Sequence, residues 1–328
     1  RWKRYQKSSK RYIKWKMQLK RNPLIKNLLG NYEFYLMLLP VIAYFIIFKY
    51  IPMYGVLIAF KDFNIFKGIW NSDWVGLEVF REVFRDKTFW RALTNTLRLN
   101  LLSLIVNFPA PIILALLMNE IRAEKFKRVV QSISYMPHFI SWVILYGIML
   151  TFLNKNTGLI NVFLKNIGLE QINFLTEKKW WIIVYLGSAI WKEVGWSTII
   201  YLAALTSIDP TLYEAAIVDG AGRFRCMWHV TLPGIKSTII IMLILRVGQT
   251  MSIGFEQPFL LGNAKVMDIA EVLSTYIYKM GIINARFSFT TAVGLFQSVV
   301  NFILLFIVNS VARALGEQDL WGGKKIEG

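Results

Sequence analysis

Long apolar runs alternate with short polar segments along this chain, and the length of the runs predicts membrane-spanning helices. A spanning helix needs about 20 mainly apolar residues. Three runs of that length carry no charged residue, at 99–119, 129–154 and 287–312. Three more are long enough but contain charged residues, at 32–59, 180–207 and 237–261. The pattern predicts an all-α polytopic membrane protein with six transmembrane helices.

The composition agrees with a membrane protein and excludes two kinds of site. Of the 328 residues, 55% are hydrophobic and only 18% are charged, whereas a soluble domain carries about 25% charge. The one cysteine, Cys226, permits no intramolecular disulfide. The two histidines, His138 and His229, are far apart in the sequence, so we expect no metal site.

The formal net charge of +18 is concentrated at the N-terminal end. Residues 1–30 contain eleven Lys or Arg and no acid, with Trp2, Tyr5, Tyr12 and Trp15 between them. A basic, aromatic segment before a span is typical of contact with an anionic membrane surface. No nucleic-acid-binding signature accompanies the charge, so we expect membrane lipid and not nucleic acid as its partner. The first apolar run is too long for a signal-peptide core, and we expect it to be retained.

The distribution of Lys and Arg also predicts the orientation. An even number of spans places both termini on one side, and the basic residues of 1–30 and 119–128 favour the cytoplasm. We therefore expect a multi-pass protein of the bacterial cytoplasmic (inner) membrane with both termini cytoplasmic. The predicted organisation is a basic amphipathic segment at 1–30, a transmembrane domain at 31–315 and a cytoplasmic tail at 316–328.

The polar segment 208–236, between the predicted fourth and fifth spans, has the composition of a helix-turn-helix. Asp209 is a good helix cap and Pro210 suits a first turn, which predicts a helix over 211–219. Gly220 allows the chain to reverse. A second helix is predicted over 223–229, and the chain re-enters the membrane near Lys236.

The same segment carries a spaced motif: Glu214-Ala215-Ala216, three residues, Gly220, nine residues, Val230, any residue, and Leu232-Pro233. It resembles the EAA signature of the membrane subunits of ATP-binding-cassette importers. The alternative is an ordinary amphipathic loop. The resemblance implies that the segment is a cytoplasmic knob held by an ATPase, with Gly220 as its pivot. The residues implied in ATPase coupling are Glu214, Ala215, Ala216, Asp219, Gly220, Leu232 and Pro233.

Further segments, at 49–63, 135–138 and 202–216, resemble the binding-protein-dependent carbohydrate permeases of the LplB type, which are related to the maltose permeases. The sequence is also compatible with the membrane subunit of an alginate importer. The resemblance implies four kinds of partner: a second homologous permease, two ATPase subunits, a periplasmic or extracytoplasmic sugar-binding protein, and membrane lipid. The chain has no G-x-x-x-x-G-K-[ST] loop, so it is expected to be non-catalytic and to hold no cofactor, with ATP and Mg on the ATPase subunits.

Charged residues near mid-membrane are candidates for the substrate path, because charge there is costly. Lys192 and Glu193 lie well inside the fourth predicted span, and Arg246 lies inside the fifth. One interpretation is a structural ion pair between Arg246 and Glu193. The other is a polar cavity in which Lys192 or Arg246 meets a sugar carboxylate or hydroxyl. Further candidates for this path are Gln249, Gln297, Asn301, Trp191, Trp196 and Tyr135.

Two other classes of function remain as alternatives. A secondary transporter or channel without an ATPase partner would use the midplane charges as an ion path, but would leave the 214–233 motif unexplained. A membrane enzyme, such as a lipid-linked glycosyltransferase, would need clustered acids, and the acids here are scattered.

Overall fold

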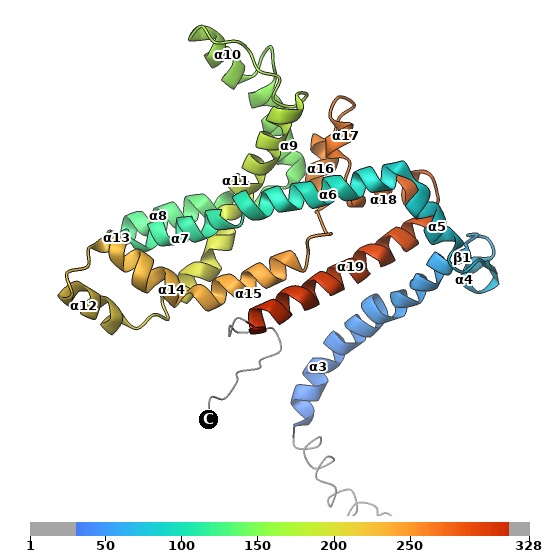
Figure 1. Ribbon diagram of the computed structural model, residues 1–328, viewed down its shortest axis with the longest axis horizontal. Helices are drawn as coiled ribbons and strands as arrows, with labels where there is room; N and C mark the ends of the chain where they lie inside the picture. Colours follow the sequence, from blue (N-terminus) through green and yellow to red (C-terminus); the bar gives the residue numbers. More distant parts are fainter. Residues whose placement is uncertain (1–30, 315–328) are drawn as a thin grey trace, which may run out of the picture. The chain divides into compact units, whose positions relative to one another are not determined.

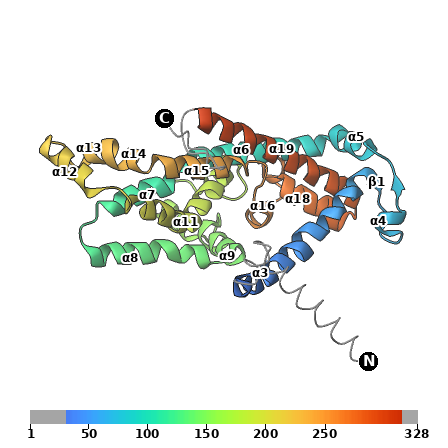
Figure 2. The ribbon, with the colours of Figure 1, turned by 90° about the horizontal axis from the view of Figure 1, so that it is seen from below.

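The computed structural model describes residues 31–314, and this part of the chain is mostly helical (Figures 1 and 2). Its sheet is a small antiparallel hairpin of β1 (Lys61–Asp62) and β2 (Asp73–Trp74). The predicted all-α fold is therefore confirmed. The predicted basic segment 1–30 and the tail 316–328 lie outside the described residues.

The helices follow one another with short connections; those labelled η are 3-10 or π-helical turns. The first half contains α3 (Tyr32–Phe45), η1 (Ile46–Tyr50), η2 (Ile51–Phe60), α4 (Gly68–Asn71), α5 (Glu78–Arg85), α6 (Lys87–Val106), α7 (Pro109–Asn119), α8 (Glu124–Tyr135), η3 (Met136–Phe139), α9 (Trp142–Leu153) and α10 (Leu159–Asn166). The second half contains α11 (Lys178–Leu205), α12 (Pro210–Val218), α13 (Arg223–Cys226), η4 (Met227–Thr231), α14 (Leu232–Gly234), α15 (Lys236–Val247), α16 (Glu256–Leu261), α17 (Met267–Ala270), α18 (Leu273–Tyr278), η5 (Lys279–Ile283) and α19 (Phe287–Ala314).

The chain divides into two compact units, Arg1–Leu57 and Ile58–Gly328. The described part of the first unit contains α3 and η1. No side chain of α3 is buried, although the helix is apolar on every side. A helix of this kind needs lipid or another protein around it.

Three helical stretches are long and apolar enough to cross a membrane, at Tyr32–Phe60, Lys87–Asn119 and Phe287–Ala314. Up to five spans result if each of two bent helix pairs also counts as one. These counts rest on length and composition within residues 31–314. The helix α11 has 28 residues, but is not among these stretches. The total of six spans therefore stays a prediction.

One predicted span, 129–154, is not a single straight helix. The pair Glu124–Phe139 and Trp142–Leu153 is bent by 101°. Pro137 lies in η3 just before the bend, and the side chain of Ser141 caps α9 by accepting the Ile144 N–H. A proline followed by a new helix cap ends one helix and starts another. The hydrophobic run predicted the length of this region but not its elbow.

A second predicted span, 237–261, is interrupted. The helix α15 ends at Val247, and a helix resumes only at Glu256, where α16 begins. Residues 248–255 are turns and irregular chain. We call residues 248–255 the unwound segment.

The core of the second unit is built around α11, which contacts α6, α7, α8, η3, α15 and α16. Trp181 is completely buried near the start of α11, and its Nε1–H donates to Leu261 O over 2.9 Å. Another apolar cluster, around Tyr201, Leu205 and Ile235, lies toward the other end of α11. Buried contacts along its whole length make α11 the helix against which the other elements are positioned.

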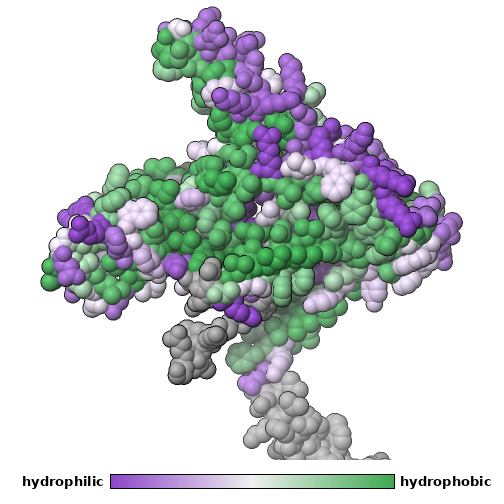
Figure 3. Space-filling model, in the orientation of Figure 1, coloured by the Kyte–Doolittle hydropathy of each residue, from purple (hydrophilic) through white to green (hydrophobic). Residues whose placement is uncertain are grey.

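The surface of this unit has the polarity of a membrane protein. Figure 3 shows hydrophobic residues over α6, α15 and α19, and hydrophilic residues gathered near α10, α5 and α12. Large apolar side chains such as Leu101, Ile105 and Phe302 are more than half exposed. An apolar band flanked by polar ends is what a bilayer requires.

The contact between α11 and α8 depends on Gly195. A Cβ atom built on Gly195 would lie 2.0 Å from Ser134 O and 2.9 Å from Tyr135 N. Both are backbone atoms and cannot move as a flexible side chain would. Gly187, two turns earlier on α11, has no such neighbour within 4 Å.

We therefore expect Gly195→Ala to lower the apparent melting temperature of the purified protein, and Gly187→Ala to change it little. Inserting a carbon into a packed contact costs about 1–3 kcal/mol. Fluorescence-monitored thermal unfolding in detergent measures both variants. Equal melting temperatures for the two variants would contradict the close approach of α8 and α11.

Candidate functional site

A cavity of about 630 Å³ lies within the second unit, among α6, α7, α11, α15 and the unwound segment. Amide, hydroxyl and charged groups face it together with aromatic rings. The polar side chains on its wall include Asn100, Ser103, Asn107, Glu193, Arg246 and Gln257. The rings of Trp142, Tyr185 and Tyr201 also line it. Such a mixture suits a polar ligand that has apolar faces.

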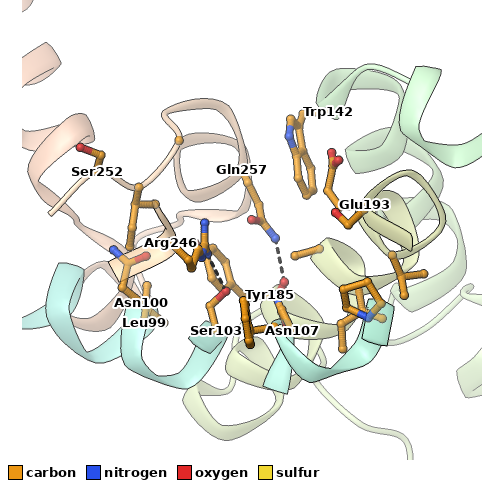
Figure 4. Close-up of a pocket in the computed structure, with 18 of the residues that line it drawn as sticks. Leu99, Asn100, Ser103, Asn107, Trp142, Tyr185, Glu193, Arg246, Ser252 and Gln257 are labelled. Carbon is orange, nitrogen blue, oxygen red and sulfur yellow. Dashed lines mark hydrogen bonds between the residues drawn. The ribbon is translucent and has the colours of Figure 1, made fainter. Parts of the chain in front are cut away.

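Arg246 projects into the cavity from the last turn of α15. Its Nη2 donates to the hydroxyl oxygen of Ser103, on α6, over 2.9 Å. Figure 4 shows Arg246, Asn100 and Ser103 on one side of the cavity, with Trp142 and Glu193 on the opposite side. A guanidinium has five N–H donors, so the bond to Ser103 orients Arg246 and leaves other donors for a ligand.

Glu193 faces the same cavity, but it is bound to α8–α9 and not to Arg246. Its Oε2 lies 2.7 Å from Nδ1 of His138, and its Oε1 lies 3.7 Å from Nζ of Lys192. Among the described residues, no ion pair joins Glu193 to Arg246. The predicted ion pair between Arg246 and Glu193 is therefore not formed. Both side chains instead line the cavity.

Lys192 lies outside the cavity wall. Its side chain is 8% exposed, and its ammonium donates to His138 O over 2.6 Å and to Ile140 O over 2.7 Å. These carbonyls lie at the elbow between η3 and α9, where no continuous helix provides donors for them. The predicted contact between Lys192 and a sugar carboxylate therefore has no support in the geometry, because the charge is used to hold the elbow.

The remaining predicted path residues lie around the cavity without lining it. Trp196 stacks on the His138 ring, with centroids 4.5 Å apart, and Asn301 binds the unwound segment from α19. Trp191, Tyr135 and Gln249 do not reach the cavity wall. The structure thus brings together only Glu193 and Arg246 of the nine residues predicted for this path.

The sequence pattern does indicate some of the cavity-lining residues that are absent from the sequence-based candidates. Asn100 and Ser103, on α6, and Asn107, the residue directly after this helix, recur at intervals of three and four. On α11, positions 185, 189, 193, 197 and 201 recur at intervals of four, and all of them line the cavity. Residues at these spacings share one helix face. Polar residues that recur at these spacings within an apolar run could therefore have predicted which face of each helix lines the cavity.

The segment 208–236 folds as the predicted helix-turn-helix, which we call the hairpin. The Asp209 carboxylate accepts the Thr211 N–H over 2.9 Å and caps α12. This bond holds the pKa of Asp209 below its ordinary value. Gly220 has φ of +77°, a conformation that favours glycine. The Tyr213 hydroxyl donates to Thr231 over 3.1 Å and joins the two arms.

The tip of the hairpin exposes apolar side chains. Val218 is 86% exposed, Phe224 is 70% exposed and Ile217 is 64% exposed. In Figure 1 the hairpin, with α12 and α13, projects beyond α7 and α15 at one end of the second unit. An apolar tip rimmed by charged residues is typical of a protein contact surface.

The seven predicted coupling residues divide between the two ends of the hairpin. Glu214, Ala215 and Asp219 are exposed on or beside α12, and Ala216 is half-buried. Leu232 packs with the cluster around Tyr201 at the base. The remaining two, Gly220 and Pro233, lie at the turn and in α14. The motif thus spans the exposed tip and the packed base of one structural element.

The sequence matches known membrane transport proteins over most of its length. The family model described as binding-protein-dependent transport system inner membrane component matches residues 107–317. The chain is 48% identical over 302 residues to the polygalacturonan/rhamnogalacturonan transport system permease protein YteP of Bacillus subtilis (strain 168), covering 92% of this chain and 94% of YteP. It is 47% identical over 309 residues to protein LplB of the same organism, covering 94% of each.

Solved structures agree with these matches. The crystal structure of a bacterial ABC transporter involved in the import of the acidic polysaccharide alginate contains a chain 42% identical, with a TM-score of 0.83 over 90% of this chain and 100% of that chain. A bacterial alginate ABC transporter in complex with an alginate pentasaccharide-bound periplasmic protein gives 41% identity and a TM-score of 0.84, over 91% and 100%.

The geometry of the elbow predicts the effect of Lys192→Met. This change keeps an apolar stem of similar length but leaves the carbonyls of His138 and Ile140 without their donor, which costs about 1–3 kcal/mol for each buried unpaired group. We expect a lower apparent melting temperature in detergent. Lys179→Met, on an exposed residue of the same helix, is the control and should melt as the parent protein does. A Lys192→Met protein as stable as the control would contradict this role.

Proposed function

The chain belongs to the family of binding-protein-dependent transport system inner membrane components, as a permease of sugar ABC importers, and we propose that the sugar it carries is an acidic oligo- or polysaccharide. In this proposal the cavity is part of the translocation path, and the hairpin is the contact with an ATPase. The permease itself carries out no chemical step.

The relatives support an acidic substrate. YteP is named for polygalacturonan and rhamnogalacturonan, and the similar crystal structures are of importers of alginate. All three polymers contain uronic acids, so each presents carboxylates along a chain of hydroxylated rings. A path for such a polymer needs both hydrogen-bonding groups and at least one cation.

The observation that carries the proposal is Arg246 on the cavity wall. Within residues 31–314, the charged side chains lining the cavity are Arg246, Glu193 and Glu256. The charge of Glu193 is opposed by Lys192 from outside the cavity. Among the described residues, the hydrogen bond from the Arg246 side chain goes to Ser103, a neutral partner. An arginine with free donors binds a carboxylate in two parallel hydrogen bonds, which is the strongest contact a uronate can make here.

The rest of the wall suits the neutral parts of a sugar. Trp142, Tyr185 and Tyr201 provide ring faces. Oδ1 of Asn107 is buried and has no hydrogen-bond partner among the described residues. A buried acceptor without a partner is rare in proteins, and a sugar hydroxyl could donate to it. We infer weak, multiple contacts, which a polymer that must move through the path requires.

The energy for transport is proposed to come from partner subunits. The sequence contains no phosphate-binding loop. The hairpin instead offers an exposed apolar tip, with Ile217, Val218 and Phe224, for insertion into an ATPase subunit. ATP and Mg would bind there, not to this chain. ATP can favour one state of the pore only if it binds the two states with different affinity.

The complete importer is proposed to contain this permease, a second homologous permease, two ATPase subunits and an extracytoplasmic sugar-binding protein. A single subunit in which no side chain of α3 is buried and many large apolar side chains are exposed has the surface that such an assembly would cover. We place the importer in the bacterial inner membrane, with the hairpin and both termini in the cytoplasm, because the basic residues gather there.

We expect Arg246→Gln to lower the ATPase stimulation by oligouronate-loaded binding protein in the reconstituted complex. A hydrogen bond to a charged group contributes about 1.5–3 kcal/mol, so the loss should be about tenfold or more. Arg246→Lys should retain part of the stimulation because it keeps the charge.

Two comparisons control that experiment. Lys179→Gln removes an exposed cation elsewhere on the chain and should leave stimulation unchanged. Neutral oligosaccharides of the same length report whether Arg246 acts on charge. Stimulation of the parent complex by neutral sugars alone, or equal losses for both sugar classes in Arg246→Gln, would exclude the proposed acidic substrate.

The hairpin geometry predicts a difference between two neighbouring glycines. Gly220 has φ of +77°, whereas Gly222 has φ of −74° with open space around its Cβ position. The left-handed conformation costs a residue with a side chain about 1–2 kcal/mol. We expect Gly220→Ala to lower co-purification of the ATPase subunits and ATP-driven uptake by about fivefold, and Gly222→Ala to leave both near the parent values. The reverse order would show that the turn does not shape the docking surface.

A further inference from the structure

The unwound segment has backbone groups that no helix satisfies, and it forms part of the cavity wall. Residues 252–257 line the cavity, beginning with Ser252 and including the start of α16. Irregular backbone at membrane depth persists only where side chains or water supply its hydrogen bonds. The question is which groups supply them here.

Amide side chains from two neighbouring helices hold this segment. On α19, Asn301 accepts the Met251 N–H over 2.9 Å through Oδ1 and donates to the Ser252 hydroxyl over 2.9 Å through Nδ2. Gln297, one turn earlier, donates to Met251 O. From α6, Asn100 donates to Thr250 O. We call Asn301 and Gln297 the amide clamp.

The clamp needs amide side chains because the segment presents both donors and acceptors. Asn301 binds a backbone N–H and a hydroxyl oxygen at the same time, which requires an acceptor and a donor on one side chain. The positions 297 and 301 are four apart, so both side chains lie on the same face of α19. The segment approaches this face closely, since a Cβ on Gly248 would lie 2.6 Å from the Leu305 side chain.

The clamp also fixes one end of α15. This helix runs from Lys236 to Val247, so it begins at the last residue of the hairpin, shortly after α14 ends at Gly234. Its twelve residues span about 18 Å. On its C-terminal side the hairpin is therefore joined to the cavity wall by this one short helix, whereas on its N-terminal side it follows α11, which also lines the cavity. When the hairpin moves, α15 can move the cavity wall with it only if the unwound segment after Val247 is held firmly in place.

We propose that Asn301 and Gln297 are positioning residues that make α15 a rigid link between the hairpin and the cavity wall. This inference rests on the proposed function, in which the hairpin binds the ATPase and the cavity carries sugar. The clamp transmits motion and does not bind sugar. Both polar atoms of Asn301 are already engaged with Met251 and Ser252, and neither Asn301 nor Gln297 lines the cavity.

The first test compares sugar uptake per ATP hydrolysed in the complete reconstituted importer. Asn301→Leu keeps a similar volume but removes two hydrogen bonds, and Gln297→Leu removes the bond to Met251 O. Interhelical hydrogen bonds in membranes contribute about 0.6 kcal/mol each, so the loss of two in Asn301→Leu should lower this ratio about eightfold. ATP hydrolysis without loaded binding protein should rise in both variants.

The control and the kinetic readout separate positioning from binding. Ser298→Ala is on the same helix, and the Ser298 hydroxyl donates only to Gly294 O of its own helix, so this variant should behave as the parent. The concentration of loaded binding protein at half-maximal ATPase activity, and the ratio of anionic to neutral sugar stimulation, should stay within about twofold in the clamp variants.

The second test observes the segment without any sugar. Gly254 lies in the unwound segment, and a Cβ at this position meets nothing within 4 Å. Gly254→Cys in a Cys226→Ser background therefore provides a single thiol beside the cavity. Its labelling rate by a charged maleimide should differ at least threefold between the nucleotide-free and the ATP-trapped complex. The added change Asn301→Leu should reduce that difference to less than about 1.5-fold.

Three outcomes would overturn the proposed role of the clamp. The first is a ratio of sugar uptake to ATP hydrolysis that is unchanged from the parent in assembled Asn301→Leu and Gln297→Leu complexes, and the second is an altered sugar preference in these variants. The third is a labelling rate in the parent that is the same with and without nucleotide. The labelling experiment uses no sugar. An importer that no uronate stimulates would therefore refute the acidic substrate while the thiol still reports on the clamp.

Discussion

Backbone groups that leave a helix inside an apolar environment must find partners within the protein, and the described part of this chain is arranged around that constraint. Its helices break at three places within long apolar runs. At two of these breaks a polar side chain from another helix supplies hydrogen bonds that the backbone lost. Lys192 binds the carbonyls at the elbow before α9, and the amide clamp binds the unwound segment. Near the break between α6 and α7, Thr198 donates to Pro111 O in the first turn of α7.

These breaks also create the cavity. Continuous helices packed around α11 would fill the space with apolar side chains. The unwound segment instead turns Ser252 and the residues after it toward α6 and α11, and the elbow places Trp142 on the opposite wall. Polar groups that satisfy the backbone and polar groups that face the cavity are therefore close neighbours on the same helices. Glu193, which lines the cavity, is adjacent in sequence to Lys192, which holds the elbow.

This proximity explains why charge alone did not predict which residues line the cavity. Lys192, Glu193 and Arg246 all lie within apolar runs, and each is a candidate by the same argument. Their roles differ because their surroundings differ: two carbonyls receive the Lys192 ammonium, whereas only one hydroxyl receives a donor from Arg246. The amide groups of Asn301 and Gln297 could bind sugar hydroxyls, but they are already hydrogen-bonded to the unwound segment. A residue type states what a side chain can bind, and its neighbours decide what it does bind.

Local sequence determined the features that depend on a few neighbouring residues. Apolar length predicted the helical membrane fold, Asp209-Pro210 and Gly220 predicted the hairpin, and the spaced motif predicted the family. Each of these predictions rests on the length of an apolar run, a helix cap, a turn or a spaced motif, and a short stretch of sequence contains all the residues involved. The 101° elbow, the end of α15 at Val247 and the composition of the cavity wall were decided by tertiary structure. They depend on hydrogen bonds between residues 46 or more positions apart, such as Gln297 with Met251 and Met251 with Asn301. No local pattern specifies which distant side chain will compensate a broken helix, because that pairing exists only once the helices have packed.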